Sequence, residues 1–240
     1  MSSTSLDQKL SILQGYSACD VSDALLKIQK VPPGQTPRAG YLADFLPFSP
    51  SPSQSTTLPK IIAPASTFKF IPKSSSPPSI PDPQSTGFPE GTHWVDHAQP
   101  GTIAVLEQPK GQYCAVLGGI MAVRMKVLGV KAALVNGRVR DLEEVRGVDL
   151  PVWALGKSTV GTAAEAKPGL RNVPVDAGGV VVEPGDIIFC DPLEGVVSIP
   201  KAHLDEVLEL MPKLVSMDDK VKEAVQNGEK VFDAFKKFRN

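Results

Sequence analysis

The sequence predicts a layered domain that mixes helices and strands, of the α/β or α+β class. Segments with helical and strand-like apolar spacing alternate between Thr102 and Leu155. A β-rich part follows, with strand candidates at 173–182, 186–190 and 195–199. The carboxyl-terminal part, 201–240, has helical spacing, with an interruption expected at Pro212. Since no internal repeat is visible, we predict one domain over residues 1–240.

Composition limits the classes of function. The chain has 240 residues and 42% hydrophobic content, which is enough for a packed core. Its 25 basic and 26 acidic residues give no charge excess that would attract nucleic acid or an anionic membrane. The three cysteines lack metal-ligand spacing, and no apolar run reaches the length of a membrane span or a signal-peptide core. We therefore expect a soluble protein of a reducing compartment, the cytoplasm.

The amino-terminal half contains helices and then a region rich in proline and serine. Residues 5–30 have helical spacing that Gly15 divides in two, and Ser17 and Asp20 are suitable caps for the second helix. Eleven of the 23 prolines lie between positions 47 and 89, a density that helices and central strands do not tolerate. We therefore predict loop insertions at 47–59 and 72–92. Between them, Lys60–Ile71 has the β-branched content of a core strand.

The stretch Gly118–Asp141 is the strongest candidate for a binding site. Its two glycines precede the periodic apolar residues of a helix that Gly129 should end. The short apolar run Ala132–Val135 predicts a buried strand, which Asn136 and Gly137 should terminate. Arg140 and Asp141 then lie just beyond the strand. In sheets of this kind, ligands bind beyond the carboxyl ends of strands and near the amino ends of helices.

The residue types in this stretch suit an anionic ligand. Arg140 presents a planar fork of donors that matches a carboxylate, and the backbone of Gly118, Gly119, Ile120 and Met121 offers helix-terminal N–H groups to an anion. Asp141 is suited to a hydrated Mg²⁺, which needs one or two carboxylates. Structural alternatives remain for each: Asp141 to Glu144 is close to a capping box, Arg140 suits a surface ion pair, and two glycines suit a turn. On spacing alone, the cap is favoured for Asp141.

The other motifs indicate a function less clearly. His93 and His97 have the i, i+4 spacing of metal ligands on a helix, but Pro100 closes the segment, so a surface helix end is favoured. We find no nucleophile elbow, P-loop or dinucleotide fingerprint. The carboxyl-terminal apolar stripe of Val231, Phe232, Phe235 and Phe238 predicts core or subunit packing. The four-residue basic end is too short to indicate nucleic-acid binding.

Several segments together resemble the RraA-like family, which contains regulators of ribonuclease activity A and class II 4-hydroxy-4-methyl-2-oxoglutarate aldolases that also decarboxylate oxaloacetate. The resemblance covers most of the chain outside the insertions. The matching segments are Cys19–Ala24, Gly118–Ala122, Leu134–Gly137, Arg140-Asp141, Leu150–Ala154 and Val180–Pro200.

The resemblance implies an α-β-β-α sandwich related to the swivelling phosphohistidine-type domain, assembled as trimers or hexamers with sites between subunits. It implies that Asp141 holds Mg²⁺ or Mn²⁺ through waters, that Arg140 binds substrate, and that the backbone of Gly118–Met121 holds the substrate carboxylate. Family aldolases often carry an acid where this chain has Gly119. The nearest match to another acid, reaching the site from the neighbouring subunit's carboxyl-terminal helix, is Asp218 or Asp219.

These parts predict a metal-dependent lyase that releases pyruvate from a 2-keto acid. A metal ion polarises the keto acid, and Arg140 helps to stabilise the enolate formed when the C3–C4 bond breaks. Aldol cleavage also needs a base; no histidine is placed for it in the sequence, so we expect a water on the metal. Decarboxylation of oxaloacetate needs no such base and should tolerate Gly119 better. The alternative function is a non-catalytic regulator that binds an RNA-processing enzyme.

Overall fold

The computed structural model describes residues 4–50, 59–76 and 83–239. Two helices, α1 (Leu6–Leu13) and α2 (Ala18–Ile28), begin the chain. Ser17 caps α2 in a reciprocal capping box with Asp20, as the sequence predicts. The amide of Ser17 donates to Oδ2 of Asp20 at 2.8 Å, which fixes the start of a helix that buries Val21 and Leu25.

A nine-stranded mixed sheet forms the centre of the molecule, in the order β1-β11-β10-β3-β4-β5-β6-β2, with β7 also paired to β3. Strands β3 to β6 run parallel to one another, and the remaining pairings are antiparallel. A separate hairpin is formed by β8 and β9. The strands are β1 (Tyr41–Leu42), β2 (Leu46–Ser49), β3 (Ile61–Pro72), β4 (Ile103–Glu107), β5 (Ala132–Val139), β6 (Val152–Lys157), β7 (Ala166–Arg171), β8 (Val175–Ala177), β9 (Val180–Val182), β10 (Ile187–Asp191) and β11 (Gly195–Ile199).

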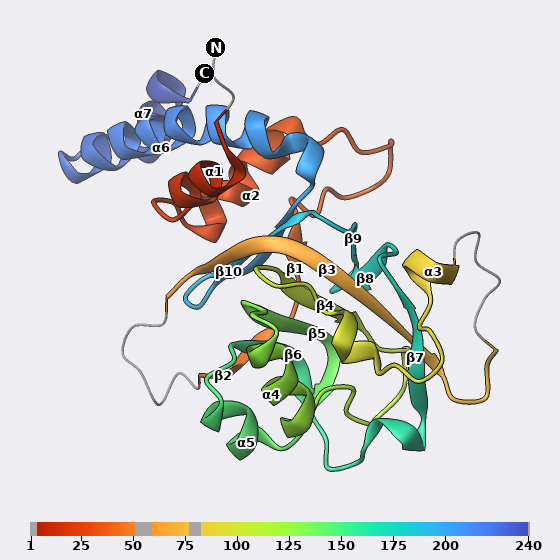
Figure 1. Cartoon of the computed structure of the whole chain (residues 1–240). Helices are drawn as coiled ribbons and strands as arrows, with labels where there is room; N and C mark the ends of the chain where they lie inside the picture. The colour runs from red at the N-terminus through yellow and green to blue at the C-terminus, as the bar shows by residue number, and fades with distance from the viewer. Residues whose placement is uncertain (1–3, 51–58, 77–82, 240) are drawn as a thin grey trace.

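Three buried clusters define four layers. One cluster, which includes Leu25, Phe189 and Met211, lies between the terminal helices and the β10–β11 part of the sheet. A second, which includes Val105 and Ile188, lies between the two halves of the sheet. The third packs α4 (Gly119–Val127) and α5 (Leu142–Gly147) against β4 to β6. Figure 1 shows the long strand β3 curving between the two halves, with the terminal helices on one side and α4 and α5 on the other. The predicted α-β-β-α sandwich is confirmed.

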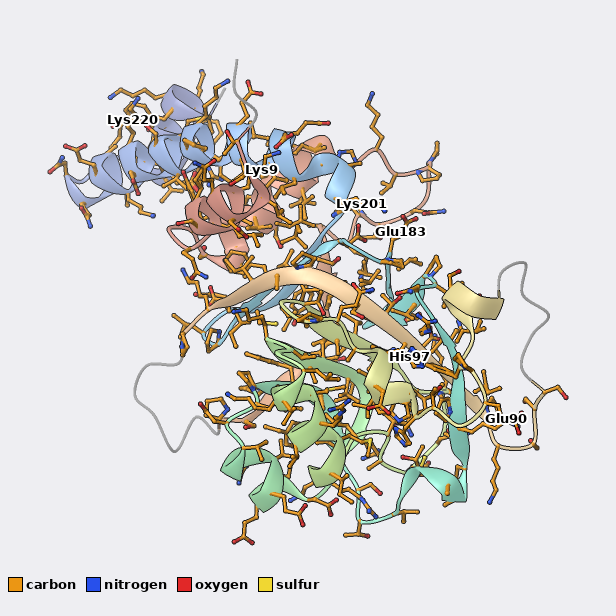
Figure 2. All side chains as sticks on the ribbon, in the orientation of Figure 1. Lys9, Glu90, His97, Glu183, Lys201 and Lys220 are labelled. Carbon is orange, nitrogen blue, oxygen red and sulfur yellow. The ribbon has the colours of Figure 1, made fainter. Side chains whose placement is uncertain are left out.

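The helical layer contains α6 (Leu204–Gln226) and α7 (Val231–Phe238). The predicted interruption at Pro212 is wrong, because α6 continues through it. Pro212 is exposed, whereas the neighbouring Met211 is fully buried, so packing of the apolar face holds the helix across the missing hydrogen bond. Figure 2 shows Lys9 and Lys220 among the side chains of this layer and His97 in the other half of the molecule.

The structure also changes some predicted boundaries. The predicted loop at 47–59 overlaps β2, which pairs with β6, and the loop at 72–92 contains the short helix α3 (Pro83–Thr86). Residues 51–58 and 77–82 of these insertions lie outside the described residues. Strand β5 does not end at Asn136 and Gly137: a register shift after Val135 lets it continue to Val139, since the side chain of Gln108 accepts a hydrogen bond from the amide of Arg138 at 2.8 Å.

Among residues 4–50, 59–76 and 83–239, no helix is both long and apolar enough to cross a membrane.

Candidate functional site

The residues of the predicted site line a cavity of about 310 Å³. One wall consists of the start of α4 and the Arg140-Asp141 pair that follows β5. A second wall comes from the 3₁₀ helices η1 (Trp94–His97) and η2 (Thr162–Ala164) and from β7. The sequence predicts the first wall, whereas η2 and β7 are absent from the sequence-based prediction.

The start of α4 exposes backbone donors to the cavity. Gly118 is the N-cap residue and provides no side-chain cap. The first amides of a helix have no partner within it, and that of Gly119 donates to Oδ2 of Asp141 at 3.3 Å. The amides of Ile120 and Met121 remain available to an anion, and all four residues from Gly118 to Met121 line the cavity.

Glycines make room for Arg140. A Cβ atom at Gly161 would lie 3.0 Å from Nη1 of Arg140, and one at Gly118 would lie 3.3 Å from its Nε. The Nε atom also lies 3.2 Å from Oδ2 of Asp141. The Arg140 side chain is 42% exposed, so its guanidinium group is anchored on one edge and open to a ligand on the other.

Asp141 has a left-handed backbone, with φ 54° and ψ 46°, a conformation that is uncommon for residues other than glycine. It stands at the N-cap position of α5, but its side chain makes no capping hydrogen bond. The capping-box interpretation is therefore wrong. The left-handed turn directs the carboxylate away from α5 and toward the start of α4, where it meets the amide of Gly119.

Glu144 supplies a second carboxylate that the sequence reasoning missed. A Cβ atom at Gly119 would collide with Oε2 of Glu144 and would lie 2.8 Å from its Cδ. A Cβ atom at Gly118 would lie 2.7 Å from Oδ2 of Asp141. The two carboxylates thus adjoin consecutive glycines. The i, i+3 spacing of Asp141 and Glu144, which placed both on one face of a helix start, was the available signal.

This pair fits a hydrated Mg²⁺ or Mn²⁺ ion. Such an ion keeps several waters and needs one or two carboxylates. Within the described ranges, no group of three or more His, Cys, Asp or Glu side chains could hold a metal ion. The histidine pair makes other contacts: Nδ1 of His93 accepts from the amide of Val95 at 3.4 Å, and Nε2 of His97 lies 3.1 Å from Oγ1 of Thr92.

The second wall is held by buried aromatic packing and by one carboxylate. Trp94 packs edge-to-face against Phe70, with ring centroids 5.2 Å apart. The carboxylate of Glu165 accepts from the amides of Cys114 and Tyr113 at 2.6 and 2.7 Å. These backbone hydrogen bonds, with that of Cys114 foremost, hold the pKa of Glu165 below its usual value. They anchor the segment that leads to the cavity wall at Ala115 and Val116.

Two side chains on this wall differ from expectation. His93 lines the cavity, although the sequence placed no histidine near the site. Lys167, on β7, also lines it.

Asp218 and Asp219 lie on α6 and do not line the cavity of their own chain. Asp218 accepts from Nε of Arg239 at 2.6 Å, and Asp219 lies 3.3 Å from Nζ of Lys222.

Comparisons with known proteins agree with this architecture. The RraA-like (Aldolase/RraA) family model matches residues 18–197. An uncharacterized protein of Methanocaldococcus jannaschii is 37% identical over 52% of this chain and 59% of its own length. A Halalkalibacterium halodurans protein provisionally named 4-hydroxy-4-methyl-2-oxoglutarate aldolase is 29% identical over 55% of this chain and 61% of its own length. The chain thus spans about three fifths of these relatives.

A solved structure shows the same fold. The protein RraAS2 of Streptomyces coelicolor, described as an unusual member of the RNase ES inhibitor RraA family, superposes with a TM-score of 0.67. It is 21% identical and covers 95% of this chain and 100% of its own. Since the family model spans most of the chain, including both carboxylates and the α4 start, the protein belongs to the RraA-like family.

Proposed function

We propose that this protein is a divalent-metal-dependent lyase that releases pyruvate from 2-oxo acids, by decarboxylating oxaloacetate and by retro-aldol cleavage of 4-hydroxy-4-methyl-2-oxoglutarate. One observation carries the proposal: open amides at the start of α4, Arg140 and Asp141 converge on one cavity, and the carboxylate of Glu144 lies against Gly119 of its lining. The similarity to relatives named as aldolases supports the same chemistry.

Each group has a distinct role in this proposal. The amides of Ile120 and Met121 bind the C1 carboxylate of the substrate, where the dipole of α4 also favours negative charge. A divalent ion held by Asp141 and Glu144 would act as a Lewis acid on the keto oxygen. Arg140 stabilises the negative charge that develops when the C3–C4 bond breaks, because its guanidinium group is held beforehand by Asp141.

Decarboxylation is the reaction that the described side chains support most directly. Aldol cleavage requires a base to remove the hydroxyl proton. His93 lines the cavity, but its Nδ1 lone pair accepts from Val95, so the other ring nitrogen carries the proton and is a donor. Oxaloacetate needs no such base to lose carbon dioxide. We therefore expect oxaloacetate to be the faster substrate.

The test is pyruvate release from each substrate, with Mg²⁺ or Mn²⁺ and with a chelator. Asp141→Asn and Arg140→Ala should each lower kcat/KM at least 100-fold, because each removes a charge that acts in the transition state. There are two matched controls. Asp149→Asn changes an aspartate that has the same left-handed backbone, at φ 54°. Arg138→Ala changes an arginine of β5, the strand that directly precedes Arg140. Neither control residue lines this cavity. Metal-independent activity, or activity unchanged in both site variants, would exclude the mechanism.

The proposal includes assembly as a trimer or hexamer with sites between subunits. Supporting it, α4 exposes an apolar stripe beside the cavity: Ile120, Val123 and Val127 are 75%, 44% and 71% exposed. In such an assembly, Asp218 or Asp219 of a neighbouring copy would be available to the site. Light scattering should give a mass of three or six chains, and Val127→Lys should reduce it.

The rival is a non-catalytic regulator of an RNA-processing enzyme. It predicts no pyruvate release with either metal, and inhibition of a ribonuclease that survives Asp141→Asn. The same set of variants therefore separates the two functions.

A further inference from the structure

Lys167 is a partly buried residue that has no partner among the described residues. Among the described residues it makes no hydrogen bond, ion pair or ring contact. Other partly buried lysines are paired: Lys60 donates to the carbonyl oxygen of Tyr16, and Lys69 lies 3.1 Å from Glu107. In the described ranges, every other lysine that lacks a partner is exposed. Lys167 also lines the cavity, so its ammonium group is available to an anionic ligand there.

The fold places Lys167 on the β7 part of the cavity that Arg140 also lines. The β3–β7 ladder pairs Ile71 with Lys167 and then shifts its register, leaving Gly169 as a bulge. Bulges re-aim neighbouring side chains and are frequent beside active sites. Phe70, which pairs with Pro168, packs on Trp94 of η1, so β7 and η1 form one continuous wall. The start of α4 and Arg140 form the other wall.

The cavity contains a second cation besides Arg140. Arg140 is paired with Asp141, whose Oδ2 lies 3.2 Å from its Nε, whereas Lys167 has no counterion among the described residues. A 2-oxo acid with one carboxylate, bound at α4, leaves that ammonium group unpaired. His93 also lines the cavity and adds a donor through the ring nitrogen that does not accept from Val95. A cavity of about 310 Å³ accommodates a small diacid between the walls.

We infer that Lys167 is a specificity-determining residue that binds the distal carboxylate of a dicarboxylic 2-oxo acid, with His93 as an accessory donor. The inference rests on the proposed function, since the C1 carboxylate is taken to bind at α4. The substrate then spans the cavity, with its keto acid end at Arg140 and its second carboxylate on β7. Monocarboxylic 2-oxo acids lack the group that Lys167 recognises and bind more weakly.

The test uses two unreactive probes that differ in one group. 2-Oxoglutarate ends in a carboxylate where 2-oxopentanoate ends in a methyl group, and neither carries a 4-hydroxyl group or a carboxylate beta to the ketone. Calorimetric titration of the full chain with Mg²⁺ should show a preference of about tenfold or more for 2-oxoglutarate, the size expected of one charge-assisted hydrogen bond. Lys167→Met should abolish the preference while leaving 2-oxopentanoate affinity unchanged. Lys167→Arg should retain it, and the control Lys157→Met, on an exposed lysine outside the cavity, should match the wild type.

Turnover separates this inference from the proposed function. For 4-hydroxy-4-methyl-2-oxoglutarate, whose distal carboxylate is retained in a product, Lys167→Met should raise KM about tenfold with little change in kcat. Pyruvate release without any preference between the probes overturns the role of Lys167 and leaves the lyase proposal standing. If the probes show a Lys167-dependent preference but no pyruvate is released, the lyase proposal is wrong and the role of Lys167 stands. If Lys167→Met weakens both probes equally, the residue is structural and the inference is wrong.

Discussion

Moving the second carboxylate from position 144 to position 119 should preserve metal-dependent activity, whereas either half of the exchange alone should lose it. Glu144→Ala removes one of the two carboxylates that adjoin Gly118 and Gly119. Loss of such a group typically weakens metal binding by about 10- to 100-fold. The Mg²⁺ concentration that gives half-maximal decarboxylation should therefore rise by that factor.

The single variant Gly119→Asp should destabilise the protein. A Cβ atom at this position would lie 2.7 Å from Cβ of Glu144 and 2.8 Å from its Cδ. Overpacking of this kind costs about 1–3 kcal/mol. Two carboxylates at roughly 4 Å would add repulsion of at most about 4 kcal/mol at an effective dielectric constant near 20, and less here because solvent reaches Glu144.

The double variant Gly119→Asp with Glu144→Ala removes the clash and restores two carboxylates. Its metal requirement and thermal unfolding temperature should both recover toward the wild type, a coupling that a double-mutant cycle measures directly. Glu143→Ala, which removes the adjacent exposed acid of α5, serves as the control. Additive effects of the two substitutions, or an unchanged metal requirement in Glu144→Ala, would refute the assignment of Glu144.

Three predictions concern stability. Glu165→Gln should destabilise the protein at neutral pH, since the pKa of Glu165 is lowered by amides such as that of Cys114. A carboxylate whose pKa is lowered by folding stabilises the protein at pH values above the pKa it has in the unfolded chain. That contribution is lost as pH falls below about 4.5, so the urea unfolding of variant and wild type should converge in acid. Met125→Ala, at a fully buried position of α4, should cost about 2–5 kcal/mol in the same assay; a smaller loss would mean that the core relaxes around it. Gly40→Ala should lower the melting temperature, because φ is 72° and the added Cβ would collide with the backbone oxygen of Ser198; an unchanged temperature would contradict that contact.

Local chemistry made much of the fold predictable. Gly118 and Gly129 bound α4 as expected, and Ser17 caps α2, because these signals act within a few residues. Strand β3 stands out from its proline-rich surroundings through its apolar and β-branched content. Strand β7 was not predictable, since Lys167, Pro168 and Gly169 do not alternate and the strand exists only by pairing with β3.

The sequence by itself determined one wall of the site: an open helix start followed, one strand later, by Arg140 and Asp141. Tertiary structure decided the placement of Asp141, because a left-handed backbone turns its carboxylate from the expected cap toward Gly119. It also brought Glu144 into the space that Gly119 leaves empty and added Lys167 to the cavity lining. Backbone dihedrals and contacts between distant strands have no signature in residue spacing, which is why the second carboxylate and the second wall required the folded chain.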